Sequence, residues 1–333
     1  MATRNVGGWV VAEDTPSEPQ EKRRLYFHGR AGSLLGMQLV NLLLILCTLG
    51  VYVFWAKVKV RRYLWSQTEF EGDRLAYHGT AGELLIGSLK AVLVFGLPFF
   101  ALKYLPQFLD ARTSVKVVCF ALAYLIILLF IPFAIVGTRR YRLSRSSWRG
   151  IRFSFRGRAV NFFRIYLKGG LLTAATLGLY SPFWNVERYG FLTSHSYVGN
   201  RKFAFDGRGR ELFRSFLFFT LLALPTLGIY GFWYEAKKQR YLIEHTSFDT
   251  ARFTCTATGG GLCRLGLVNL LAVIATLGFA APWATVRNFR YWYDHIALEG
   301  ALDLAAIAQE AQAASATAEG LAGFLDLDFS LGA

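Results

Sequence analysis

Long runs without a charged residue dominate the hydrophobic pattern of this chain. Five uncharged runs cover 31–56, 117–138, 169–186, 215–234 and 265–286, and a sixth apolar run, 84–102, is interrupted only by Lys90. A helix needs about 20 apolar residues to cross the ~30 Å hydrocarbon core of a bilayer. Tryptophans, which are enriched at membrane interfaces, stand near the run ends at Trp55, Trp184, Trp233 and Trp283. The pattern predicts about six membrane-spanning helices.

These runs belong to an internal repeat. A Thr-Leu-Gly motif followed by aromatic residues begins at Thr48, Thr176, Thr226 and Thr276. An aromatic-x-Gly motif precedes the runs at Phe27, Tyr77, Phe155 and Phe205, with a degenerate copy at Cys255. The starts define five units, about 25–75, 76–153, 154–203, 204–253 and 254–300. The second unit is the longest and has room for one more helix.

Each unit has the same expected order of elements. The apolar helix ends at Thr-Leu-Gly, where glycine can adopt a left-handed cap. A short helix rich in bases and aromatic residues follows, and it carries an Arg-Tyr pair in four units, at Arg62, Arg140, Arg240 and Arg290. The third unit has Gly190-Phe191 instead. An alternating stretch such as 74–77 or 152–155 then predicts a short strand.

The predicted fold class is an all-α polytopic membrane protein. Its spans lie in five degenerate repeats of ~50 residues, with short interfacial amphipathic helices and strands between the spans. Polar tails flank this membrane domain of residues 25–300, at 1–24 and at 301–333, the latter rich in alanine and acids. We expect a short helix in the C-terminal tail.

Two topologies fit the six runs. Simple alternating crossings place nearly equal numbers of bases on the two sides, with the base-rich loop 139–158 in the cytoplasm and both termini outside. Alternatively, every unit is a hairpin or re-entrant element, and only 103–116 faces out. Span length favours the six crossings, whereas the charge rule favours the hairpins.

Composition narrows the function classes. The chain is 54% hydrophobic and 18% charged with a net charge of +15, which argues against a soluble enzyme and against a disordered chain. No nucleotide-binding, metalloprotease or serine-hydrolase motif is present, and the four cysteines are scattered. We therefore expect no enzymatic activity, no cofactor and no metal site.

The segment 48–85, TLGVYVFWAKVKVRRYLWSQTEFEGDRLAYHGTAGELL, resembles the signature of the YjgN-like family of bacterial inner-membrane proteins of unknown function. The resemblance covers roughly residues 25–300 and implies a multi-pass protein of the bacterial inner (plasma) membrane. It carries over no catalytic residue. The third unit, without Arg-Tyr, and the fifth, without the terminal strand, depart from the signature.

Bases beside the spans are the candidate contacts for anionic lipid headgroups. Lys90 and Lys168 occupy equivalent places inside spans, where a lysine can serve a site or extend to the headgroups. Asn41 and Asn269 are also equivalent, and we expect them to hydrogen-bond another helix and close the bundle. The full candidate set for anion or lipid contact is Arg62, Arg139, Arg140, Arg142, Lys90, Lys168 and Arg240.

All five histidines follow the repeat. His28 and His78 share one motif position, while His195, His245 and His295 share another. A metal or proton site is one interpretation. A repeated capping hydrogen bond is favoured, because Gln67 and Arg145 stand at the matching positions of the other units.

The sequence thus predicts a non-enzymatic scaffold or lipid-associated envelope protein. The alternative is a transporter or channel for a small anionic or amphiphilic solute, suggested by repeated units and glycine-interrupted spans. The expected partner is the bilayer, through anionic phospholipid headgroups. Nucleic acid is a poor partner, because the bases lie within a turn or two of the spans.

Overall fold

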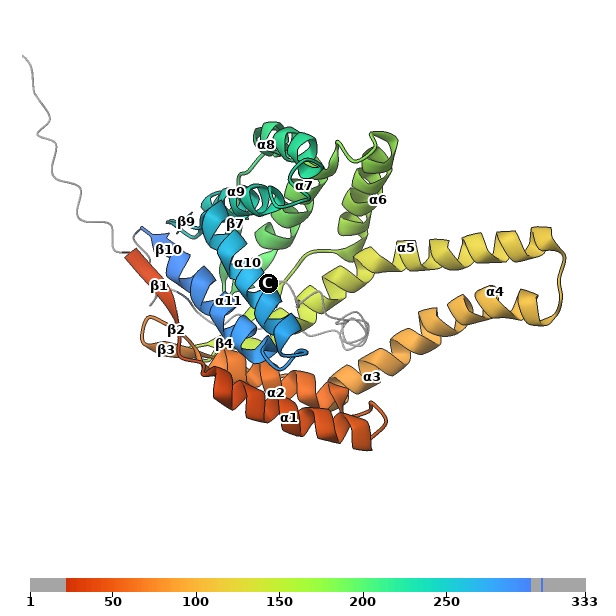
Figure 1. Cartoon of the computed structure of the whole chain (residues 1–333), viewed down its shortest axis with the longest axis horizontal. Helices are drawn as coiled ribbons and strands as arrows, with labels where there is room; N and C mark the ends of the chain where they lie inside the picture. Colours follow the sequence, from red (N-terminus) through yellow and green to blue (C-terminus); the bar gives the residue numbers. More distant parts are fainter. Residues whose placement is uncertain (1–21, 301–306, 308–333) are drawn as a thin grey trace, which may run out of the picture.

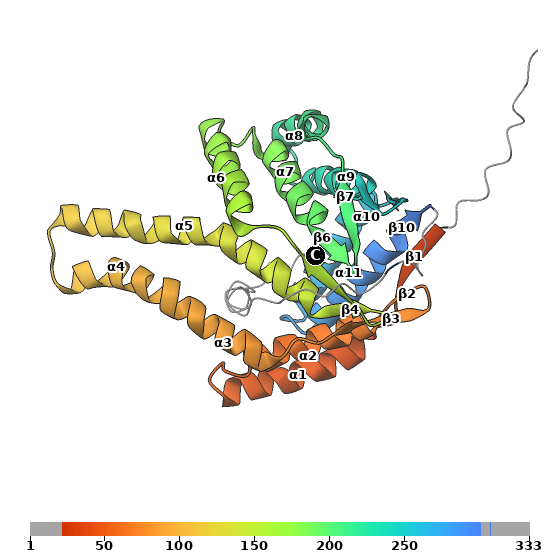
Figure 2. The same cartoon turned by 180° about the vertical axis from the view of Figure 1, so that it is seen from behind.

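The computed structural model describes residues 22–300 and Ile307, and it contains a closed antiparallel barrel of ten short strands (Figures 1 and 2). The barrel order is β1-β10-β9-β8-β7-β6-β5-β4-β3-β2, so β1 and β10 close the ring. The strands are β1 (Lys22–Phe27), β2 (Thr68–Phe70), β3 (Asp73–Tyr77), β4 (Ser146–Trp148), β5 (Ile151–Phe155), β6 (Ser196–Val198), β7 (Arg201–Phe205), β8 (Thr246–Phe248), β9 (Ala251–Cys255) and β10 (Ile296–Glu299).

Helix pairs connect alternate strands at one end of the barrel. Because each odd-numbered strand leads into a helix pair and the following even-numbered strand leaves it, all five pairs start from the same end, and they splay apart (Figures 1 and 2). The helices are α1 (Ala31–Cys47), α2 (Val53–Ser66), α3 (Ala81–Ala91), the π-helix η1 (Val92–Gly96), α4 (Leu97–Phe108), α5 (Thr113–Ser144), α6 (Ala159–Ala175), α7 (Ser181–Ser194), α8 (Gly209–Ala223), α9 (Gly231–Glu244), α10 (Gly259–Ala275) and α11 (Ala281–His295).

The predicted all-α class with about six spans is therefore wrong. The short strands expected between spans pair into a closed barrel, and only two helices in the described part are long and apolar enough to cross a membrane. These are the continuous helix Ala81–Phe108, of 28 residues, and Thr113–Ser144, of 32 residues. The other apolar runs each divide at Thr-Leu-Gly into a short helix and the beginning of a second one, so run length overstated helix length.

The arrangement corresponds to the hairpin alternative and not to six alternating crossings. Every unit has the same orientation, since its helix pair leaves the barrel end opposite the strand turns. The predicted tails lie almost wholly outside the described residues, and the helix expected in 301–323 lies among them.

Apolar side chains fill the barrel. Side chains alternate along each strand, and every second one points into the barrel. The buried cluster there contains Trp148, Val198, Phe248, Ala251 and Leu298. Ile307 packs against the same cluster. The alternate residues face outward, which leaves an exposed base at the second position of four strands: Arg74, Arg152, Lys202 and Arg252.

Strand turns and aromatic rings explain the glycines of the repeat. Glu71-Gly72 and Arg149-Gly150 form two-residue hairpin turns with positive φ at both positions, the geometry that matches strand twist. Gly79 belongs to the aromatic-x-Gly motif, and a Cβ there would lie 2.4 Å from the Tyr77 hydroxyl. A Cβ at Gly29, Gly157 or Gly207 would lie similarly close to the aromatic ring two residues earlier. In the fifth unit the ring is absent, and alanine replaces the glycine at 257.

Neighbouring units pack in a ring. The second helix of each unit contacts the first helix of the next, and α11 returns to α1. Asn269 fulfils the expectation of a helix-to-helix bond, because its amide donates to Asn288 on α11 at 2.9 Å. Asn41 does not, since it is 4% exposed and neither amide atom has a partner in the described part of the chain. Strand and helix contacts therefore close the ring without it.

Candidate membrane-binding surface

Four of the five helix pairs turn through Thr-Leu-Gly. The leucine has φ between +48° and +51°, and the glycine follows with φ between +82° and +96°. A left-handed backbone costs a residue with a Cβ roughly 1–2 kcal/mol. The leucine side chains at these tips are nonetheless 91–95% exposed: Leu49, Leu177, Leu227 and Leu277. The fold thus accepts backbone strain to hold a large apolar side chain at the outer end of four helix pairs.

Hydrogen bonds within each tip satisfy its polar groups. The Thr48 hydroxyl donates to the Leu44 carbonyl at 2.7 Å and accepts from the Tyr52 N–H at 3.0 Å. The Gly50 N–H donates to the Ile45 carbonyl at 2.8 Å. The same bonds recur at Thr176, Thr226 and Thr276. Such internal pairing is required where hydrocarbon replaces water, because unpaired backbone groups there cost several kcal/mol each.

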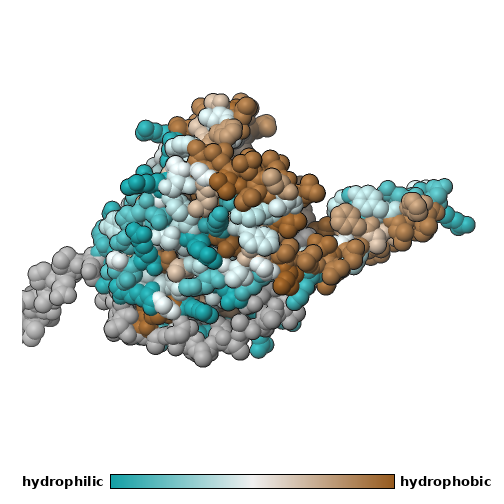
Figure 3. Space-filling model, turned by 90° about the horizontal axis from the view of Figure 1, so that it is seen from below, coloured by the Kyte–Doolittle hydropathy of each residue, from teal (hydrophilic) through white to brown (hydrophobic). Residues whose placement is uncertain are grey.

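The second unit has a different tip. Its pair, formed by α3, η1, α4 and α5, is the longest and extends well beyond the others (Figure 1). The turn between α4 and α5 is polar: Asp110, with φ of +47°, accepts from the Lys116 ammonium at 3.1 Å. Figure 3 shows a hydrophobic stem with hydrophilic residues at its far end. Length and tip polarity thus set this pair apart from the other four.

Apolar side chains cover the outer faces of the helix pairs. Leu43, Leu46, Leu171, Leu221 and Leu271 are 63–73% exposed. On the face seen in Figure 3, hydrophobic residues gather along the stem and next to it, while hydrophilic residues gather mainly on the side away from the stem. An apolar surface of this extent needs a partner, and for long helix pairs that partner can be lipid.

Three exposed arginines occupy equivalent places on this surface. Arg164, Arg214 and Arg264 each lie on the sixth residue of α6, α8 and α10, or about 8 Å from the barrel end of the helix. None of them has an acidic partner within residues 22–300. Sequence reasoning missed this set, although a spacing of 50 residues could have revealed it.

The arginines of the Arg-Tyr pairs have an internal role. Each donates to a carbonyl in the turn that leads into the next unit: Arg62 to Gly79 at 3.4 Å, Arg140 to Gly157 at 2.9 Å, and Arg240 to Ala257. Arg290 donates to Gly29 at 3.0 Å and so links the last unit to the first. These bonds account for Arg62, Arg140 and Arg240 without a lipid ligand.

The tyrosines of these pairs fix the start of their own unit's first helix. The Tyr241 hydroxyl accepts from the Arg208 N–H at 2.6 Å and donates to the Arg208 carbonyl at 3.0 Å. Tyr63 and Tyr291 repeat the arrangement with Arg30 and Thr258. Burial raises the pKa of Tyr241, in keeping with a neutral phenol that both donates and accepts.

The remaining candidate bases are dispersed. Lys90 is exposed on α3, and Lys168 on α6 lies 3.6 Å from the Glu187 carboxylate of α7. Arg139 donates to the Ser196 hydroxyl at 3.4 Å, and Arg142 is half-buried on α5. Of these four bases, Lys168 lines a pocket that the structure describes.

The histidines do not converge. His195, His245 and His295 each bond through Nδ1 to the carbonyl four residues earlier, at 2.7–2.9 Å, which is the repeated capping interaction. His28 contacts Glu69 at 3.0 Å and His78 contacts Ser147 at 2.8 Å. Over residues 22–300, no group of three His, Cys, Asp or Glu side chains could hold a metal ion.

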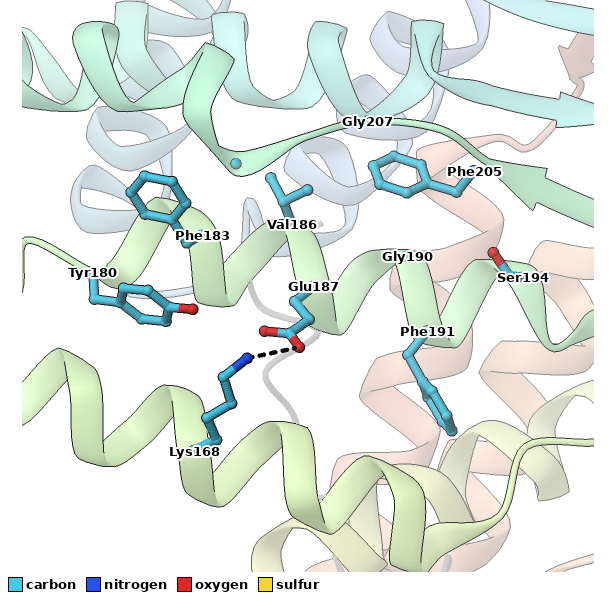
Figure 4. A pocket seen from close by; sticks show the side chains of 11 residues that line it. Lys168, Tyr180, Phe183, Val186, Glu187, Gly190, Phe191, Ser194, Phe205 and Gly207 are labelled. Carbon is cyan, nitrogen blue, oxygen red and sulfur yellow. Dashed lines mark ion pairs between the residues drawn. The ribbon is translucent and has the colours of Figure 1, made fainter.

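Two open pockets lie in equivalent grooves between units. One, of about 420 Å³, lies where the fifth unit meets the first and is lined by Arg30, Trp283, Arg287 and Arg290. The other, of about 360 Å³, lies where the third unit meets the fourth and contains Lys168, Glu187 and Gly190 (Figure 4). On the same helix α7, the Arg188 guanidinium lies 4.5 Å from the Trp184 ring centroid.

Comparison with known proteins gives a family but no solved structure. The family model described as bacterial protein of unknown function (DUF898) matches residues 22–225, 201–264 and 226–324. Inner membrane protein YjgN of Escherichia coli K12 is 33% identical over 129 residues, which is 39% of this chain and 30% of that protein. The Salmonella typhimurium protein of the same name is 30% identical over 139 residues, or 42% and 33% of the two chains. The chain thus aligns with about a third of the length of these relatives. No solved structure matches.

Proposed function

Because this chain belongs to the bacterial family of unknown function (DUF898), and its relatives carry the name inner membrane protein, we propose that it is an inner-membrane protein whose five helix pairs enter the bilayer from one side. The observation that carries the proposal is the set of four tip leucines, each at least 91% exposed on a strained turn with its polar groups satisfied.

Helix length assigns a depth to each pair. The helices of the second unit, of 28 and 32 residues, are about 42 and 48 Å long, so this pair crosses a ~30 Å core and returns. Its polar tip at Asp110 then emerges on the far side. The other first helices have 15–17 residues, or about 22–26 Å. Their apolar tips stay within the hydrocarbon.

Charge orients the protein. The bases of the repeat cluster at the barrel end of the helix pairs, as Arg62, Arg140 and Arg240 illustrate. Bases near the membrane favour the cytoplasmic side. The barrel therefore lies in the cytoplasm, and the turn between α4 and α5 faces out.

Within this placement the protein acts as a non-enzymatic, lipid-associated scaffold. Arg164, Arg214 and Arg264 lie at the depth of the headgroups and contact anionic phospholipids, each contributing about 1 kcal/mol.

The filled barrel gives no support to transport along its axis. The side chains of Trp148, Val198, Phe248 and Leu298 pack together in its interior. A transporter or channel would need a path between the helix pairs, and no observation in the described part favours one.

Lipid retention tests the scaffold proposal. We would replace Arg164, Arg214 and Arg264 with glutamine, purify the full chain in mild detergent, and measure the co-purified lipids by mass spectrometry. We expect the anionic fraction to fall. The matched control replaces Arg74, Arg152 and Lys202, which are also exposed but lie on the outer face of the barrel. Equal lipid content in the two variants would contradict the proposal.

A further inference from the structure

The third unit breaks the arginine pattern, and a pocket lies beside the position of the missing side chain, where a Cβ would lie 2.8 Å from the Phe205 ring. In the other four units an arginine of the second helix donates to the carbonyl of the next unit's turn. On α7 that position is Gly190, and the matching carbonyl belongs to Gly207. Both residues line the pocket of about 360 Å³, which extends across α7 from α6 to the turn before α8 (Figure 4).

The charges of this groove are also changed. The position three residues before the missing arginine holds Lys59, Lys237 and Arg287 in three other units, whereas α7 has Glu187. Lys168 of α6 faces Glu187 at 3.6 Å, and both side chains are partly exposed (Figure 4). The equivalent groove between the fifth and first units holds Arg30, Arg287 and Arg290. One groove is therefore purely basic, and the other carries one acid and one base.

Aromatic residues form much of the remaining lining. Tyr180 and Phe183 lie toward the tip of the helix pair, and Phe191 and Phe205 lie toward the barrel. In the proposed membrane placement, which this inference assumes, the groove opens at headgroup level and continues into the hydrocarbon between helices. An amphiphile can thus place its polar end at Glu187 and its chains beside Phe183.

We propose that this pocket binds a zwitterionic phospholipid with a primary ammonium headgroup. The ammonium binds the Glu187 carboxylate, which points from α7 toward α6 and Lys168 (Figure 4). It offers N–H donors to this carboxylate, as an arginine would. The phosphate faces the Lys168 ammonium. A quaternary choline headgroup has no N–H to donate and fits less well.

Lipid exchange in detergent tests this assignment without requiring insertion into a bilayer. The full purified chain receives equimolar phospholipids with ethanolamine, choline or glycerol headgroups and identical acyl chains, and native mass spectrometry counts the bound lipids. We expect about tenfold preference for ethanolamine over choline, since a hydrogen bond to a charged group contributes about one decade in affinity. Soluble phosphoethanolamine, added separately, distinguishes a headgroup site from a lipid site: competition by it at equal concentration would overturn the lipid assignment.

Two variants locate the binding. Gly190→Arg restores the residue of the other units, although the Phe205 ring must shift, because a Cβ at position 190 would lie 2.8 Å from it. The arginine can pair with Glu187 three residues earlier and should abolish the preference. If this variant fails to fold, Glu187→Gln carries the test, with Glu235→Gln on α9 as the control, since Glu235 pairs with Lys238 outside the pocket.

The results separate the two proposals. Equal binding of ethanolamine and choline lipids by the unchanged chain, or a preference that survives both pocket variants, would overturn the pocket assignment. Neither result bears on the depth of the tip leucines, which is measured in bilayers.

Discussion

Replacing Leu177 with glycine separates the lipid role of a tip from its structural role. Leu177 is 95% exposed with φ of +51°. Glycine adopts this backbone without the roughly 1–2 kcal/mol cost that a Cβ brings, and it loses about 0.5–1 kcal/mol through the entropy of the unfolded chain. The folding free energy should therefore change little. If the side chain lies in lipid, however, its removal costs about 2 kcal/mol of insertion.

The assay measures how often the tip reaches water. Leu179, in the same turn, is replaced by the only cysteine of a cysteine-free chain reconstituted into liposomes. A thiol reagent that does not cross membranes then labels the tip only when it emerges. A loss of about 2 kcal/mol should raise the labelling rate about thirty-fold, with an unchanged melting temperature in detergent.

A matched variant at the polar tip controls for the backbone. Asp110→Gly replaces another exposed residue with positive φ, and a cysteine at the neighbouring Ala111 should label rapidly with or without it. If Leu177→Gly left the labelling rate at Leu179 unchanged, or if it unfolded the protein, the tip leucines would not be membrane anchors.

Three further predictions concern the interior. Tyr241→Phe removes two hydrogen bonds to Arg208 and should lower the free energy of unfolding by about 1–3 kcal/mol, measured by thermal melting in detergent. Asn41→Leu should raise the melting temperature, because it removes a buried amide without a partner in residues 22–300; a lower value would show that the amide is satisfied. Burial raises the pKa of Cys255, so its thiol should alkylate far more slowly at pH 8 than a small free thiol in solution. The neutral thiol stabilises the folded protein below the ordinary thiol pKa, and this stabilisation is lost as the pH rises beyond that pKa. A melting temperature that did not change with pH in this range would contradict the prediction.

The sequence was sufficient for the second helices and for the strands around 74–77 and 152–155. The Arg-Tyr pairs and Thr-Leu-Gly turns recur because each forms hydrogen bonds that are repeated between or within units. The bond from Arg140 to the Gly157 carbonyl is an example. The resemblance to the YjgN-like family is confirmed by the comparisons. Two exceptions in the repeat, Gly190 and Glu187, were visible in the sequence, yet only the structure places them in one pocket.

The barrel could not be predicted, for a physical reason. Its even-numbered strands are three or four residues long and follow directly from helices. They are therefore too short to show the alternation of apolar and polar residues that predicts a strand. The turn residues Glu71 and Arg149 adopt positive φ but are not the asparagine or glycine that signals such a turn. Hydropathy could not reveal the helix breaks either, since Leu49 and Leu177 keep the turns as apolar as the helices.

Sidedness of three positions tests the central claim most directly. Single cysteines at Asn200, Thr250 and Asp110 are labelled with a reagent that does not cross membranes, in intact and in opened cells. Asn200 and Thr250 lie in consecutive turns of one barrel, so we predict that both label only from the cytoplasm, whereas Asp110 labels only from outside. Labelling of Asn200 and Thr250 from opposite sides would show alternating crossings and contradict the account.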